Sequence, residues 1–128
     1  MGTVTVKTCE LIGPALDWAV ARGEGIVPFS DGISWIIEVS GVCRQLPKYS
    51  TDWSQGGPII ERESIDTFTE KKSYHDSWLA SVARYQNAKK LVGWRIHQYG
   101  PTPLIAAMRC YVASKLGDTV QIPRELVP

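Results

Sequence analysis

The sequence has little cysteine, little histidine and almost no net charge. Its 128 residues include three Cys and two His, and 14 basic residues against 13 acidic ones leave a net charge of +1. Cys9, Cys43 and Cys110 lie far apart and outside any CxxC or metal-ligand spacing, so we expect reduced thiols. His75 and His97 have no ligating neighbour at metal-binding spacing either. The sequence therefore predicts no metal site.

Long hydrophobic runs, blocks of one charge and common catalytic motifs are also missing. No segment approaches the roughly 18 apolar residues of a membrane span, and the first residues do not resemble a signal peptide. Basic and acidic residues are interleaved, which disfavours nucleic acid because such binding relies on clustered Lys and Arg. The GxSxG, P-loop and GxGxxG motifs are absent. We expect a soluble protein that binds no membrane and uses no cofactor.

The chain does contain enough apolar material for one folded domain. Hydrophobic residues make up 44% of it and charged residues 21%, values typical of a globular domain of this length. Alternation of apolar and polar residues with period two predicts strands. They are expected at residues 3–8, 25–28, 33–39, 64–69, 77–85, 91–99 and 118–123, with the 33–39 strand central.

Two segments have the apolar spacing and the end residues of amphipathic helices. The first covers about residues 13–22, with Pro14 in the first turn and Gly23 at the end. The second covers residues 102–116, where Thr102 can accept hydrogen bonds from the first turn. These are the two helices that we expect to pack against the strands.

The predicted fold class is a single α+β domain over residues 1–128, with a mainly antiparallel sheet packed against the two helices. Residues 77–98 fit both a helix and a β-hairpin. We favour the hairpin, because residues 91–99 alternate and are rich in β-branched and aromatic side chains. Residues 123–128 are expected to fray.

The segment richest in contact-forming groups is residues 49–63. It combines tryptophan, short polar side chains and two glycines that let a ligand approach closely, and Pro58 should interrupt any helical turn. We expect a recognition loop held by Ile59 and Ile60, with arginines that would grip a phosphate. The expected ligand-binding residues are Tyr49, Ser50, Thr51, Asp52, Trp53, Gln55, Gly56, Gly57, Arg62 and Arg109.

Structural roles compete with the binding roles of these residues. Arg62 lies between Glu61 and Glu63, a triplet that also fits a solvated rim with weak local ion pairs. Arg109 also fits a solubilising position on the last helix. Asp52 with either glutamate would make an acid–base pair, but carboxylates at surface turns mostly serve capping and solubility. No catalytic residue is therefore predicted.

Three segments together are similar to a known family. They are residues 16–21 (LDWAVA), residues 49–63, and residues 100–110 (GPTPLIAAMRC) with KLGD at 115–118. In this order they resemble the NinX family of small proteins from lambdoid and related phages and prophages, over nearly the whole chain. That family carries no activity that can be transferred, but the resemblance implies a phage accessory protein in the host cytoplasm.

Three functions follow as hypotheses. The favoured one is non-catalytic binding of a host-derived ligand, for example by a counter-defence protein that sequesters a nucleotide-like signal. The second is a protein–protein inhibitor or adaptor of a host factor, with Trp53 as a hot spot. The third is a small enzyme acting on a phosphorylated metabolite, which would depend on Asp52. Five Trp and five Tyr also leave material for a homo-oligomer surface.

Overall fold

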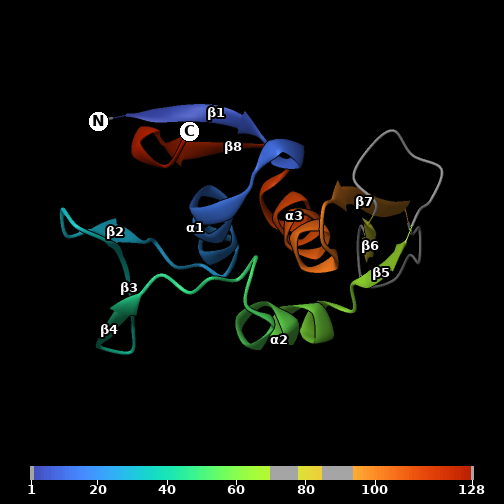
Figure 1. The fold of residues 1–128 in the computed structure, drawn as a ribbon, viewed down its shortest axis with the longest axis horizontal. Coiled ribbons are helices and arrows are strands. Elements are labelled where there is room, and N and C mark those ends of the chain that lie inside the picture. The colour runs from blue at the N-terminus through green and yellow to red at the C-terminus, as the bar shows by residue number, and fades with distance from the viewer. Residues whose placement is uncertain (1, 70–77, 85–93, 128) are drawn as a thin grey trace.

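The computed structural model describes residues 2–69, 78–84 and 94–127 (Figure 1). This part of the chain forms three α-helices and three small antiparallel sheets, which confirms the α+β class but gives one helix more than expected. The helices are α1 (Gly13–Gly23), α2 (Trp53–Glu63) and α3 (Pro103–Leu116). The sheets contain β1 (Thr3–Lys7) with β8 (Thr119–Pro123); β2 (Phe29–Ser30), β3 (Trp35–Val39) and β4 (Val42–Gln45); and β5 (Asp66–Thr69), β6 (Trp78–Arg84) and β7 (Trp94–Gly100).

Helix α3 lies at the centre of the molecule, between α1 and the β5–β7 sheet (Figure 1). Thr102 accepts a hydrogen bond from the Ile105 N–H at 3.1 Å, Pro103 begins the first turn and Gly117 (φ 100°) ends the helix, as its sequence predicts. Ten consecutive residues from Leu104 to Ala113 are buried. A single apolar stripe was expected, but other elements cover α3 on nearly every side.

Helix α1 confirms the other helix prediction, and it packs directly on α3. Its residues 15–21 are all buried. Gly23 permits the close approach, because a Cβ atom there would lie 2.8 Å from the Tyr111 ring. The two helices therefore meet where α1 ends.

Most predicted strands are present. β1 and β8 pair with Thr5 opposite Gln121, which joins the two ends of the chain. β6 and β7 pair with Ser81 opposite His97, which confirms the hairpin over residues 77–98. The expected connection at 86–90 and the turn at 70–73 lie outside the described residues.

The β2–β4 sheet differs from its prediction. Strand β3 is central only within this small sheet; Ile37 is buried, whereas Ile33 is 96% exposed. Ser40 (φ 52°) and Gly41 (φ 80°) make a tight turn that connects β3 to β4. No strand forms at 25–28, and the two-residue strand β2 begins directly after it at Phe29.

Residues 53–63 of the expected loop form helix α2, so the prediction of a loop conformation was wrong. Asp52 caps it by accepting from the Ser54 N–H at 2.9 Å. Pro58 fits inside the helix at the loss of one backbone hydrogen bond. Gly56 lets α2 pack closely, since a Cβ there would lie 2.3 Å from the Tyr49 carbonyl oxygen. Tertiary packing thus overrides the low helix propensity of the Gly-Gly-Pro run.

The C-terminal tail is packed at least as far as Val127. Arg124–Leu126 form a 3₁₀ turn, and the Arg124 N–H donates to the Gly2 carbonyl at 3.0 Å. Leu126 and Val127 pack against the core. These contacts replace the fraying expected for residues 123–128.

Two neighbouring glycines of α2 give a matched stability test. Gly56→Ala should lower the free energy of unfolding by about 1–3 kcal/mol, because the new methyl group meets Tyr49 and the Leu104 side chain at 2.7 Å. Gly57→Ala should be neutral or raise it by up to about 1 kcal/mol, since its nearest neighbour is Trp53 at 3.8 Å and alanine favours helix. Urea unfolding measures both. Equal effects would contradict close packing at Gly56.

Candidate functional site

The segment before α2 is fixed to α1 by a buried hydrogen-bonded pair. The Ser50 N–H and hydroxyl both donate to one carboxylate oxygen of Asp17, at 2.8 and 2.7 Å. Burial raises the pKa of Asp17, and hydrogen bonds from Ser50 partly oppose that rise. Ser50, expected to contact ligand, therefore holds the chain in place.

The neighbouring residues of the predicted site also have structural partners. Tyr49 is buried and burial raises its pKa, while the Thr51 N–H donates to the Lys48 carbonyl at 3.2 Å. The cap bonds from Ser54 lower the pKa of Asp52. Asp52 is thus the N-cap of α2, which is the capping role given above as the alternative to an acid–base role. Gln55 and Gly57 are half-buried and Gly56 is buried.

Trp53 is the exposed large hydrophobic residue of the predicted site, with 53% of its surface accessible. It lines a cavity of about 170 Å³ together with Ser50, Thr51 and the start of α3 at Thr102, Leu104 and Ile105. Small-molecule pockets usually measure roughly 300–1,000 Å³. The Trp53 cavity is therefore too small for a nucleotide-sized ligand.

Arg62 lies apart from Trp53 and is already paired. Its guanidinium donates to both carboxylate oxygens of Glu24 at 2.9 and 2.6 Å, and to Glu63 at 3.0 Å. Nine helical residues place Arg62 about 13 Å along α2 from Trp53 and half a turn around it. The two side chains therefore do not form one ligand grip.

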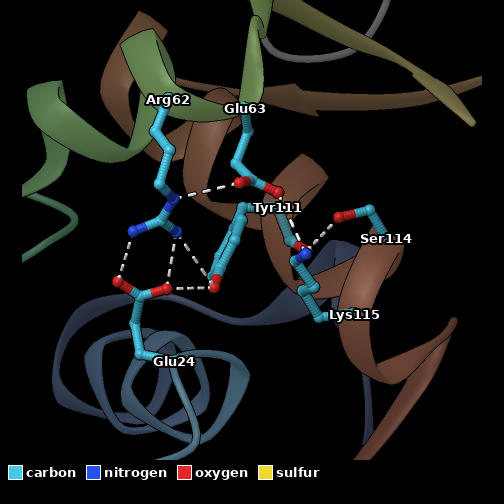
Figure 2. A network of polar contacts seen from close by, with 6 residues as sticks. All are labelled: Glu24, Arg62, Glu63, Tyr111, Ser114 and Lys115. Carbon is cyan, nitrogen blue, oxygen red and sulfur yellow. Dashed lines mark hydrogen bonds and ion pairs between the residues drawn. The ribbon is translucent and has the colours of Figure 1, made fainter.

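Arg62 belongs to a polar network that joins the three helices (Figure 2). In Figure 2, Glu24 at the end of α1 and Arg62 of α2 meet the Tyr111 hydroxyl of α3, which donates to Glu24. Lys115 of α3 binds Glu63 at 3.1 Å. Both cations lie 5.9 Å from the centre of the Tyr111 ring. The hydrogen bond from Arg62 lowers the pKa of Glu24, so we assign this network to holding α2 in place.

Arg109 is inside the protein rather than on its surface. It is 6% exposed, and it donates to the Leu11 and Tyr99 carbonyls at 2.8 Å each. Next to it, burial raises the pKa of the Cys110 thiol to about 12. Arg109 thus connects α3 to two distant segments.

A larger hollow lies between α1 and the β1–β8 pair, which are neighbours in Figure 1. We call this hollow of about 540 Å³ the Trp18 groove. Its volume is typical of small-molecule sites. Half of its lining residues are apolar or aromatic, and the others are one cation and three uncharged polar residues: Thr3, Trp18, Arg22, Val27, Leu116, Thr119, Val120 and Gln121.

Trp18 and Arg22 give the groove its chemistry. The Arg22 guanidinium lies 6.0 Å from the centre of the Trp18 ring. Among the described residues Arg22 has no carboxylate partner, and the buried Trp18 indole N–H has no hydrogen-bond partner. Arg62 and Arg109, by contrast, are both engaged. The groove therefore offers a positive charge against an apolar wall.

The sequence analysis did not select this groove. A signal was present, because Trp18 and Arg22 are four residues apart on one helix and so lie side by side. The other half of the groove comes from β8, a hundred residues later. No local pattern indicates that β8 lies beside α1.

Neither a metal site nor a membrane helix is found in the described part of the chain. No three His, Cys, Asp or Glu side chains gather there as a metal would require. No helix in residues 2–69, 78–84 and 94–127 is long and apolar enough to span a membrane. Cys9 and Cys43 are exposed, Cys110 is buried, and all three are free thiols, as the sequence predicts.

The comparison with protein families decides the relationship. The model of the family described as Bacteriophage P22, NinX matches residues 7–115. The chain belongs to the NinX family. A search of the curated proteins finds no match. The NinX region includes Trp18, Arg22, the helix network and the whole of α2, whereas the β8 side of the groove lies beyond it.

The pH dependence of stability tests the helix network. Glu24→Gln should lower the free energy of unfolding at pH 7 by about 1 kcal/mol, a small value because Arg62 is half exposed. Arg62 holds the pKa of Glu24 below 4.5, so its stabilisation is present at neutral pH and is lost as the pH falls through that lowered pKa. The two proteins should therefore differ at neutral pH and become equally stable only when the pH falls below the lowered pKa of Glu24.

Urea unfolding from pH 7 to pH 3 provides the measurement. Glu38→Gln, at an exposed position of β3, is the matched control and should change stability little at any pH. A Glu24→Gln effect that stays constant across this range would show that the charge of Glu24 contributes nothing.

Proposed function

We propose that this NinX-family phage protein binds a small host-derived ligand in the Trp18 groove, without catalysis, in the host cytoplasm. The observation that carries the proposal is a groove of about 540 Å³ with Arg22 unpaired among the described residues. A cation beside apolar surface is the arrangement by which pockets orient ligands. The described lining includes no His, Cys, Asp or Glu, which supports binding rather than turnover.

A nucleotide-like ligand fits the lining chemistry. Arg22 would pair with a phosphate oxygen, and the Thr119 hydroxyl would contact a sugar or base edge. Thr3 and Gln121 are already engaged, because the Thr3 hydroxyl donates to the Gln121 amide oxygen at 3.1 Å and the Gln121 amide nitrogen donates to the Thr5 hydroxyl at 2.6 Å. The apolar residues would contact a base. A protein that binds such a ligand without consuming it acts by sequestration, which is the chemistry of the counter-defence hypothesis.

Arg22→Gln tests the groove. Titration calorimetry with a panel of mononucleotides and cyclic nucleotides should find a ligand for the unaltered protein, and the variant should bind it about tenfold or more weakly, because a charge-assisted hydrogen bond is lost. Arg44→Gln makes the same change at an exposed arginine outside the groove lining and should bind normally. Equal affinities of the two variants would place the ligand elsewhere.

The exposed Trp53 supports a second function, a protein–protein inhibitor or adaptor of a host factor. A half-exposed tryptophan on a helix held by polar contacts is typical of an interface hot spot. Native mass spectrometry of protein purified from infected cells should then show a host partner, or a second copy of the chain, that Trp53→Ala loses. Phe68→Ala, at an aromatic residue 44% exposed, is the control. A complex retained by Trp53→Ala would contradict this role.

A further inference from the structure

We infer that the ligand of the Trp18 groove is a monoanion with an apolar or aromatic body, and not a polyphosphate. This inference rests on the proposed function and specifies its ligand. Two features of the groove carry it: the balance of charge around Arg22, and the apolar surface opposite that charge.

The groove has one full positive charge. Arg22 is the one charged residue among its described lining residues. A negative charge that leaves water for apolar surroundings must be paired, and one guanidinium pairs one anionic group through two parallel hydrogen bonds. A second or third phosphate would remain without a partner.

The helix ends at the groove oppose further negative charge. Arg22 lies in the last turn of α1, and Leu116 is the last residue of α3. Helix C-termini carry a partial negative charge, equivalent to roughly half an electron each. Arg22 therefore faces a background that tolerates a single anion and repels a polyanion.

The remaining wall favours an apolar body. Val27 and Leu116 are 66% and 38% exposed, and they flank Trp18 and Val120, which are largely buried. Exposed apolar side chains around a hollow gain stability when a ligand covers them. One charge beside this surface matches a ligand with one anionic group and an apolar or aromatic part.

Two fluorescent dyes measure separately what the negative charge and the apolar body of a ligand contribute to binding. 1-Anilinonaphthalene-8-sulfonate is an aromatic monoanion, and N-phenyl-1-naphthylamine is its uncharged analogue. The sulfonate should bind at least tenfold more tightly than the neutral dye, and Arg22→Gln should remove that preference. Arg22→Lys keeps the positive charge and should retain part of the preference for the sulfonate. Arg44→Gln should behave like the unaltered protein. Cyclic 3′,5′-AMP, with one negative charge, should displace the sulfonate more effectively than ATP.

The outcomes distinguish the two claims. Binding of neither dye would overturn the proposed function together with this inference. Binding of both dyes with equal affinity, or stronger displacement by ATP, would overturn the monoanion alone and leave the groove as a binding site. Thermal unfolding of each variant confirms that the fold is retained, and Leu116→Ser, in the groove wall, should weaken both dyes.

Discussion

The burial of α3 is the constraint on which the rest of the structure depends. Ten consecutive residues of this helix are shielded from water, so elements must cover all of its sides. The β5–β7 sheet, α1 and α2 each contact it. Arg109 extends the same arrangement by bonding backbone carbonyls from two distant segments. The Trp18 groove and the exposed Trp53 both lie on elements that pack on α3, namely α1 and β8 for the groove and α2 for Trp53.

Helix α2 shows that side chains needed to hold an element in place are not free to bind a ligand. It buries only Gly56 and Ile59, so polar contacts hold much of it: the Glu24–Arg62 pair at one end and the Asp17–Ser50 pair just before its start. Residues that looked suited to ligand contact are therefore occupied in attaching α2. Among the described residues no such polar pair joins α1 to β8, and there the Trp18 groove remains open.

Capping residues and apolar alternation predicted the elements whose ends depend on residues close by in the sequence. Thr102 and Gly117 delimit α3 because capping involves residues within one turn, and the β6 and β7 strands follow from alternation. Helix α2 was missed because its glycines and proline disfavour helix locally. Glycine is required at position 56 because the Tyr49 carbonyl packs against it and leaves no room for a side chain. That contact exists only in the folded protein.

The sequence by itself determined the α+β class, the ends of α1 and α3, and the relationship to the NinX family, since these depend on local spacing and on motif order. The tertiary structure alone decided which arginines have partners. Arg62 meets a carboxylate 38 positions earlier and Arg109 a carbonyl 98 positions earlier, whereas Arg22 lies beside β8 in an apolar groove. An arginine is available to a ligand only if folding brings no acceptor to it, and those acceptors are distant in the chain.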